Sequence, residues 1–170
     1  VAKKFAAGDK TIDADYGQVA TEIAARFQTP AALQKAVETA ATPPAHALAL
    51  HAASGVTTPE AARAQLEWML TPAVKLQDVR SILWPLASHH ATRATTLAWV
   101  REHWDALRKK LPGPLGRGLV GMSGYACTPA ALADARAFYT QKAATLEGAA
   151  RPLMQSRESA SLCVALRAEL

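Results

Sequence analysis

Apolar residues recur along this chain at the three- and four-residue spacing of an α-helix, not at the two-residue spacing of a strand. The clearest stretch places apolar residues on a single helical face, at Leu97, Val100, Trp104, Leu107 and Leu111. We find no sustained alternation of apolar and polar residues bounded by hairpin turn signals. The pattern therefore predicts an all-α protein.

Threonine followed by proline marks several predicted helix starts. The letters TPAAL begin at Thr29 and again at Thr128, and TPEAA begins at Thr58. A threonine hydroxyl accepts a hydrogen bond from an otherwise unpaired backbone N–H, and proline suits the first helical position because its missing donor costs nothing there. We interpret the repeat as helix initiation and not as a duplicated binding motif. Asp13 or Asp15 is expected to cap an earlier helix in the same way.

Prolines and glycines predict where these helices end. Thr42–Pro44 stops one helix, Gly55 ends the next as the glycine that follows its last residue, and Thr71-Pro72 ends a third. Pro85 is expected to kink a helix or start a new turn. The predicted helices cover about residues 15–27, 30–41, 45–54, 59–70, 75–88, 95–111, 129–144 and 149–170, with a short glycine-rich segment at 115–125.

Successive helices with short connections favour antiparallel neighbours. Stacked helix pairs of this length resemble an α-solenoid of the HEAT or armadillo kind. We therefore expect a single helical-repeat domain over residues 1–170. Because the chain begins with valine and not methionine, we also expect it to be a fragment of a larger protein.

Composition and charge narrow the class of partner. Half of the residues are apolar and 19% are charged, which is typical of a folded domain, and no apolar run reaches the length of a membrane span. The net charge is +5, and the longest run of basic residues is Arg108–Lys110. No aromatic residues interleave with that run, so we expect neither nucleic acid nor a membrane as partner. No targeting segment is recognisable, which leaves cytoplasmic and exported locations open.

The residue types of common active sites do not form a recognisable motif. The zinc motif HExxH is absent, and His46 and His51 are five residues apart, which separates them around a helix. His89 and His90 lie near a predicted helix end, where we interpret them as partners of free carbonyls. Ser123 is interpreted as a turn or cap residue, since its surroundings lack the GxSxG pattern. No self-contained active site is predicted.

Cysteine and tryptophan are interpreted as packing residues. Cys127 and Cys163 fit neither a disulfide framework nor a CxxC metal site, so each is expected to be a small buried apolar residue. The four tryptophans Trp68, Trp84, Trp99 and Trp104 are expected in the core, with the indole N–H bonded to a neighbour. Trp99 and Trp104 are five apart, so we expect only one of them at the centre of its helical stripe.

The pair Gln77-Asp78 falls in the first turn of a predicted helix. An acidic side chain there can cap backbone N–H groups and offset the helix dipole. It can also bond to the preceding inter-helix turn and lock one helix pair against the next. We expect this pair to have a structural role.

The order of these features resembles the C-terminal helical domain of the aminopeptidase N and puromycin-sensitive aminopeptidase family, which is similar to the endoplasmic-reticulum aminopeptidase C-terminal region. The landmarks are an Ala/Leu-rich helix at 45–53, a helix at 59–70, Gln77-Asp78, Trp99, Trp104, and then Arg151, Gln155 and Glu158 in the final helix. His103 departs from the family pattern, which has asparagine there. The likeness covers about residues 45–170 and is looser before residue 45.

This resemblance implies a non-catalytic domain of a zinc aminopeptidase. The family's HExxH motif and zinc lie in an earlier domain, so no catalytic residue, metal ligand or cofactor is expected in this chain. The domain is expected to cover the active-site cavity of the same polypeptide and to gate or position peptide substrates. Basic residues would suit a peptide carboxylate, and the candidates are Arg63, Arg80, Arg101 and Arg136. A free-standing helical-repeat scaffold that binds a protein partner is the alternative.

Overall fold

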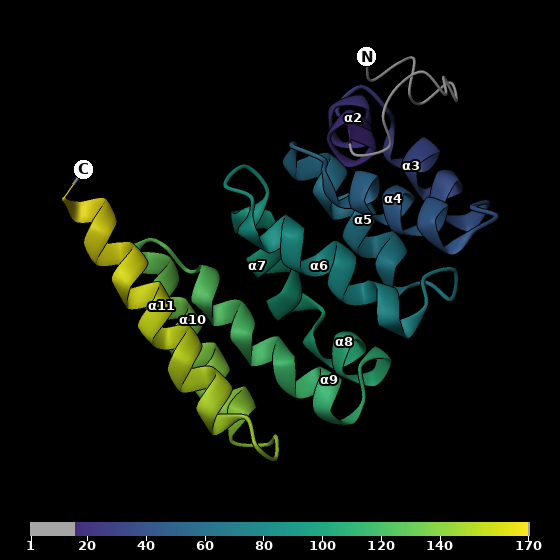
Figure 1. Cartoon of the computed structure of the whole chain (residues 1–170). Coiled ribbons are helices and arrows are strands. Elements are labelled where there is room, and N and C mark those ends of the chain that lie inside the picture. The colour runs from purple at the N-terminus through teal and green to yellow at the C-terminus, as the bar shows by residue number, and fades with distance from the viewer. Residues whose placement is uncertain (1–15, 170) are drawn as a thin grey trace. The chain divides into compact units, whose positions relative to one another are not determined.

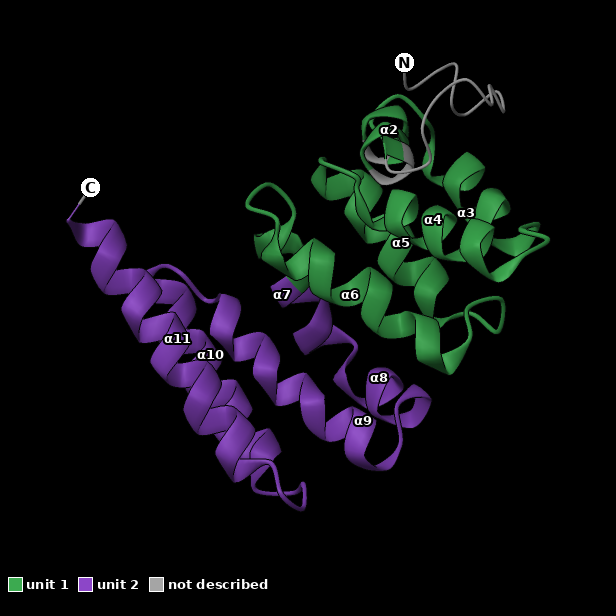
Figure 2. Cartoon of the chain, in the orientation of Figure 1, with its two compact units in different colours: residues 1–96 green, residues 97–170 purple. Residues whose placement is uncertain are grey.

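The computed structural model of the chain describes residues 16–169 and is built from helices, with no strand among these residues (Figure 1). The all-α prediction is confirmed. The chain divides into two compact units, which comprise residues 1–96 and 97–170 (Figure 2). Asp13 and Asp15, the expected caps of the first predicted helix, lie outside the described residues.

Helix α4 occupies the centre of unit 1. It contacts α2, α3, α5 and α6, and it buries Leu50, Ala52 and Ala53 on several sides. An apolar, alanine-rich sequence suits this position because small side chains let neighbouring helices approach closely. The described helices of the unit are α2 (Gly17–Ala25), α3 (Pro30–Glu38), α4 (Pro43–Ser54), α5 (Pro59–Leu70), the 3₁₀ helix η2 (Leu76–Asp78), α6 (Val79–Ser88) and the start of α7 (Arg93–Glu102).

The threonine caps form as the sequence predicts. The Thr29, Thr58 and Thr128 hydroxyls each accept a hydrogen bond from the backbone N–H three residues later, at 3.3, 3.2 and 3.2 Å. Thr42 makes the same bond at 3.3 Å. Thr42–Pro44 was expected only to stop a helix, yet it also starts α4, because Thr42 caps the helix whose first residue is Pro43.

Helices α4 and α6 end at Ser54 and Ser88, as expected, whereas α3 ends earlier than the expected residue 41. Helix α3 ends at Glu38, and the Thr39 hydroxyl donates to the Lys35 carbonyl at 2.8 Å, which closes the last turn locally. Gly55 follows α4 with a φ of −84°, so it is not a left-handed glycine. Pro85 lies inside α6, which continues to Ser88.

The predicted helix over residues 95–111 is two helices. Helix α7 ends at Glu102, and α8 (Trp104–Lys110) begins after His103. This break changes the direction of the apolar face, so Trp99 and Trp104 are both buried, contrary to the expectation that only one is central. Val100, Leu107 and Leu111 are buried as the stripe predicts, whereas Leu97 is only half-buried.

Unit 2 is organised by the long C-terminal helix α11 (Ala150–Ala168), which packs against both η3 (Gly118–Tyr125) and α10 (Pro129–Ala143). Ser123 on η3 is buried and shares a 2.6 Å hydrogen bond with the Ser156 hydroxyl of α11. It is therefore an interface residue and not a turn or cap residue. The glycine-rich segment that precedes η3 also contains a short helix, α9 (Gly113–Arg117).

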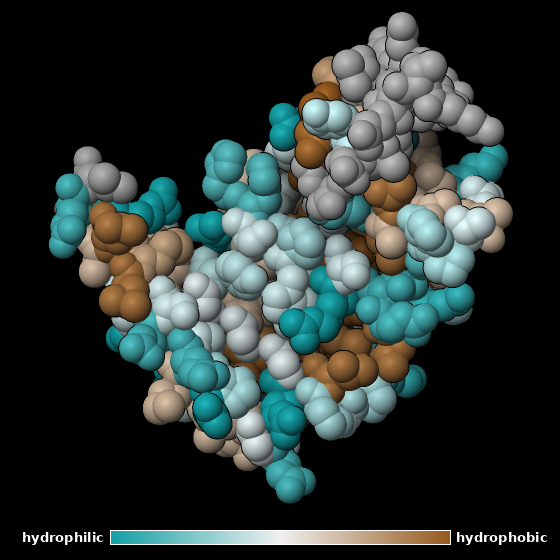
Figure 3. Space-filling view, viewed as in Figure 1, coloured by the Kyte–Doolittle hydropathy of each residue, from teal (hydrophilic) through white to brown (hydrophobic). Residues whose placement is uncertain are grey.

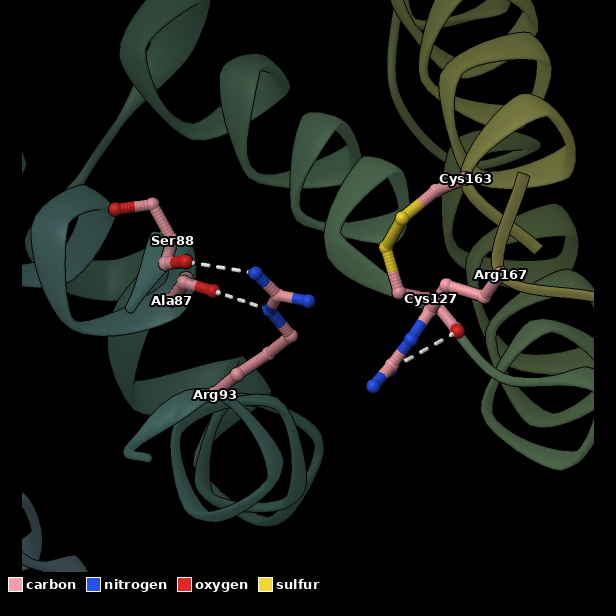
Figure 4. The surroundings of a disulfide bond; sticks show 6 residues. All are labelled: Ala87, Ser88, Arg93, Cys127, Cys163 and Arg167. Atoms are coloured by element: carbon pink, nitrogen blue, oxygen red, sulfur yellow. Dashed lines mark hydrogen bonds between the residues drawn. A yellow bond between two sulfur atoms is a disulfide. The ribbon is translucent and has the colours of Figure 1, made fainter. Parts of the chain in front are cut away.

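A disulfide joins Cys127, between η3 and α10, to Cys163 on α11 (Figure 4). The prediction of two unpaired buried cysteines is wrong. Their Cα atoms are 5.2 Å apart although 36 positions separate them in sequence. The packing of α11 against α10 and η3 creates this proximity, which no local sequence pattern shows.

Each unit leaves apolar side chains at its surface. Tyr16, Val19, Ile23 and Phe27 are exposed in and beside α2, and Phe27 is 81% exposed. Their spacing of three and four places them on one helical face. On α11, Met154, Leu162 and Leu166 are exposed, and Figure 3 shows apolar side chains at the surface near its C-terminal end. No helix in the described part of the chain is long and apolar enough to cross a membrane.

Candidate functional site

Asp78 connects two helices of unit 1. Its carboxylate Oδ2 lies 3.0 Å from Nε2 of His46 on α4, and the other ring nitrogen of His46 lies 3.2 Å from the carbonyl oxygen of Val37 on α3. The imidazole therefore links α3, α4 and the start of α6. These contacts give the expected locking role a geometric basis. The expected capping role is wrong, because the Asp78 side chain makes no capping bond at α6. Its neighbour Gln77 is exposed.

Trp99 and Trp104 occupy the core of unit 2. The Trp99 ring stacks on His103 with centroids 4.3 Å apart, and Nδ1 of His103 lies 3.1 Å from the Trp99 carbonyl oxygen. Trp104 meets the rings of Phe138 and Tyr139 edge-on, at 5.4 and 5.9 Å. Both tryptophans act in packing, which agrees with the sequence interpretation.

The other tryptophans lie in unit 1. Trp68 on α5 is buried and donates its indole N–H to the Glu38 carboxylate at 2.9 Å, as expected for a satisfied packing residue. Trp84 on α6 is half-buried, and the Arg80 guanidinium lies 4.8 Å from its ring centroid. This cation–π contact covers part of the ring that the helices leave open.

The four arginines predicted to contact a peptide carboxylate are divided between the two compact units. Arg63 on α5 and Arg80 on α6 belong to unit 1, whereas Arg101 on α7 and Arg136 on α10 belong to unit 2. Arg63 pairs with Glu67 at 3.8 Å, and Arg101 pairs with Asp134 at 3.4 Å.

Arg80 and Arg136 make contacts of a different kind. Arg80 stacks on Trp84, and Arg136 donates to the Ser161 hydroxyl at 3.1 Å. Neither contact involves a carboxylate, so neither contact neutralises the charge of its arginine. They are therefore better placed than Arg63 and Arg101 to meet an external anion.

The last three predicted landmarks lie on α11. Arg151, Gln155 and Glu158 are four and three residues apart and exposed, so they share one open face of the helix. None of them packs in the core of unit 2. Their place on a surface is compatible with contact to another domain or partner.

A cavity of about 460 Å³ in unit 1 carries the densest group of ionisable side chains that we find. We call it the basic pocket, and its ionisable lining residues are Arg26, His51, His89, His90 and Arg93. Among the described residues, none that lines it is acidic. The packing of α4 against both α2 and α6 brings these residues together.

Arg93 and His89 are held in place by backbone contacts. The Arg93 guanidinium donates to the carbonyls of Ala87 and Ser88 at 3.3 and 2.7 Å, which caps the end of α6 (Figure 4). Nδ1 of His89 accepts from the Ala91 N–H at 3.3 Å. The prediction that the two histidines bind free helix carbonyls is therefore wrong for His89, because Arg93 takes that role.

Electrostatics in the basic pocket oppose further positive charge. Burial lowers the pKa of His89 below its ordinary value, and the charges of His90 and of both pocket arginines lower it further. The neutral imidazole that results has its proton on Nε2, because Nδ1 accepts from Ala91. The ionisable side chains that line the pocket in the described part of the chain are therefore basic ones.

No group of three histidine, cysteine, aspartate or glutamate side chains within residues 16–169 is arranged to hold a metal ion. His51, His89 and His90 line one cavity, but its other ionisable residues are arginines, which do not bind metal.

Comparison with known families shows the family to which the chain belongs. The family model described as the ERAP1-like C-terminal domain matches residues 1–162. This chain belongs to that family. Comparison with curated proteins gave no match.

The match to the ERAP1-like C-terminal domain begins at residue 1, although the sequence landmarks tied residues 1–44 to the resemblance only loosely. It also spans both compact units. Sequence reasoning on the ERAP1-like domain missed the basic pocket. The nearest signal was the run His89, His90 and Arg93, but nothing local links that run to Arg26 or His51 on other helices.

Proposed function

We propose that this chain is the non-catalytic C-terminal domain of a zinc aminopeptidase of the aminopeptidase N and puromycin-sensitive type. The observation that carries the proposal is the family match over residues 1–162. The parent enzyme's zinc and catalytic residues belong to another domain of the same polypeptide. The role of this domain is to cover the active-site cavity and to gate or position peptide substrates.

The proposed architecture is a HEAT-like stack of helix pairs. Support comes from unit 1, where α3 contacts α4 and α5, and α4 contacts α5 and α6. Contact of each helix with the next and the next but one is the pattern that stacked helix pairs produce. Such stacks present extended surfaces, which suit the covering of a cavity and the binding of a peptide.

Either Arg80 in unit 1 or Arg136 in unit 2 is the proposed contact for the peptide carboxylate, since Arg63 and Arg101 already pair with carboxylates of the chain. In the enzyme that carries this domain, we expect either Arg80→Ala or Arg136→Ala to raise KM for long peptides about five-fold, which is typical of losing one charge-assisted hydrogen bond. The rate with a single aminoacyl reporter should not change, because that substrate does not reach this domain.

Two comparisons make this kinetic test specific. A peptide with an amidated C-terminus should lose the difference between wild type and variants, because its terminal charge is gone. Equal effects of the substitutions on the reporter and on long peptides would contradict gating. The chain alone is expected to bind no stoichiometric zinc and to hydrolyse no aminoacyl substrate.

The exposed apolar side chains on α2 favour one alternative, a free-standing helical-repeat scaffold that binds a protein partner. Tyr16, Val19, Ile23 and Phe27 form a face that a partner or another domain of the parent would cover. The parent reading frame separates the two functions. An HExxH motif upstream of this chain supports the aminopeptidase, and its absence supports the scaffold.

A further inference from the structure

The C-terminal end of α11 contacts the rest of unit 2 through the disulfide at the point where its buried stripe ends. The buried side chains of the helix are Leu153, Ser156 and Ala160, which are three and four residues apart. Cys163 is the next position of this stripe. Among the described residues of α11, none after Ala160 is buried. The bond from Cys163 to Cys127 therefore takes the place of side-chain packing at this end of the helix.

Two hydrogen bonds accompany the disulfide there. Arg167, one turn after Cys163, donates from Nη1 to the carbonyl of Cys127 at 3.5 Å (Figure 4). Arg136 on α10 donates to the Ser161 hydroxyl at 3.1 Å. Hydrogen bonds at an open surface contribute little net stability, because water competes for the same donors and acceptors. The disulfide is therefore the main link between the last two turns of α11, residues 161–168, and the neighbouring elements of unit 2.

The two cysteines differ in exposure and in surroundings. Cys127 is buried, with 8% of its surface exposed, whereas Cys163 is only half-buried. An attacking thiolate therefore reaches Sγ of Cys163 more easily. The Arg167 guanidinium lies beside Cys127 (Figure 4), and a nearby cation favours the thiolate form of a cysteine. Cys127 is therefore the better leaving group of the pair.

We propose that the Cys127–Cys163 disulfide is a reversible exchange site for a low-molecular-mass thiol, which becomes attached to Cys163. The thiol loses its proton to solvent, and its thiolate attacks Sγ of Cys163. A new S–S bond forms as the bond between the two cysteines breaks, and the electron pair of the broken bond leaves on Sγ of Cys127. The number of S–S bonds is unchanged, so the step requires no oxidant. The reverse attack by the Cys127 thiolate restores the original bond.

Exchange at Cys163 removes the covalent link of residues 161–168. The first part of α11 keeps its packing, because Leu153 and Ala160 are buried and Ser156 shares its 2.6 Å bond with Ser123. The site is therefore a local switch that releases the end of α11 from a folded unit 2. It is independent of the proposed function, because it requires neither a peptide nor the catalytic domain.

Incubation of the oxidised full chain with reduced glutathione, a monothiol, tests the site. Rapid alkylation with N-ethylmaleimide stops the exchange, and peptide mass mapping locates the added groups. We expect the first product to carry glutathione on Cys163 and the maleimide on Cys127. Glutathione mainly on Cys127 would overturn the direction of attack. Exchange that occurs only when urea unfolds the chain would overturn the site.

Arg167→Gln tests the leaving group. We expect it to slow formation of the mixed disulfide about three-fold or more, because the departing Cys127 thiolate loses a neighbouring cation. Arg151→Gln is the matched control, since Arg151 is an exposed cation in the first turn of the same helix, and it should leave the rate unchanged. Equal slowing by both variants would show only weaker attraction of anionic glutathione. That result, or faster exchange in Arg167→Gln, would overturn the role of Cys127 as leaving group.

Hydrogen exchange read by mass spectrometry tests the local release. In Cys127→Ser treated with glutathione disulfide, the adduct on Cys163 is retained, because the chain has only two cysteines and no second thiol can displace it. Compared with oxidised wild type, the adduct should accelerate exchange of residues 161–168 more than that of residues 150–160. Equal acceleration along α11 would show that the helix unfolds as a whole and would overturn the switch.

Discussion

At the residue scale, the bond between His46 and Asp78 gives the family landmark Asp78 a physical role. Asp78 is buried, and His46 is its partner at 3.0 Å. We expect Asp78→Ala to lower the free energy of unfolding by about 1.5–3 kcal/mol, the usual contribution of a buried hydrogen bond that involves a charged group. Urea unfolding followed by circular dichroism measures the change.

Two controls separate this bond from general damage to unit 1. Gln77→Ala alters an exposed neighbour and should change stability by less than about 0.5 kcal/mol. The double variant His46→Ala/Asp78→Ala should be less destabilised than the sum of the two single variants, because the bond can be lost only once. Additive effects would show that Asp78 acts through another contact.

At the element scale, the sequence predicts to the residue the helix starts that follow Thr29, Thr58 and Thr128. A Thr-Pro start depends on a few adjacent residues, and the hydrogen bonds of Thr29, Thr58 and Thr128 form as expected. An end depends on tertiary contacts as well. Pro85 stays inside α6 because the buried residues around it, including Leu83 and Leu86, hold the helix against α4 and α5.

The caps allow a matched test on α5, whose predicted bounds of Pro59–Leu70 are confirmed. Thr58→Ala should cost about 1 kcal/mol, because the Ala61 N–H loses its 3.2 Å acceptor. Thr58→Ser keeps the hydroxyl and should recover most of that stability. Urea unfolding midpoints compare the three proteins, and equal loss for alanine and serine would show that the methyl group, and not the hydroxyl, matters.

At the scale of the whole molecule, composition and periodicity determine the class of fold but not the contacts between distant segments. The all-α prediction follows from spacing within each helix. The basic pocket combines Arg26, His51 and Arg93, which are brought together only when α2 and α6 pack against α4. The pairing of Cys127 with Cys163 has the same origin in unit 2. A single sequence contains no direct signal for either.

The disulfide provides a test at this scale because it closes a long segment of unit 2. For a separation of 36 residues, the loss of chain entropy in the unfolded state predicts about 4 kcal/mol of stabilisation. The double variant Cys127→Ser/Cys163→Ser should therefore exchange the amide hydrogens of α10 and α11 faster than wild type. Hydrogen exchange read by mass spectrometry resolves these helices from the rest of the chain.

Helix α4 is the internal reference for this experiment, because it belongs to unit 1 and has no covalent link to the cysteines beyond the chain itself. Its exchange should stay unchanged in the double variant. A reducing agent should accelerate α10 and α11 in wild type and leave the variant unaffected, which distinguishes loss of the bond from the effect of serine. Equal acceleration of α4 and α11 would mean that the two compact units unfold as one, whereas no acceleration anywhere would mean that the bond does not contribute to stability.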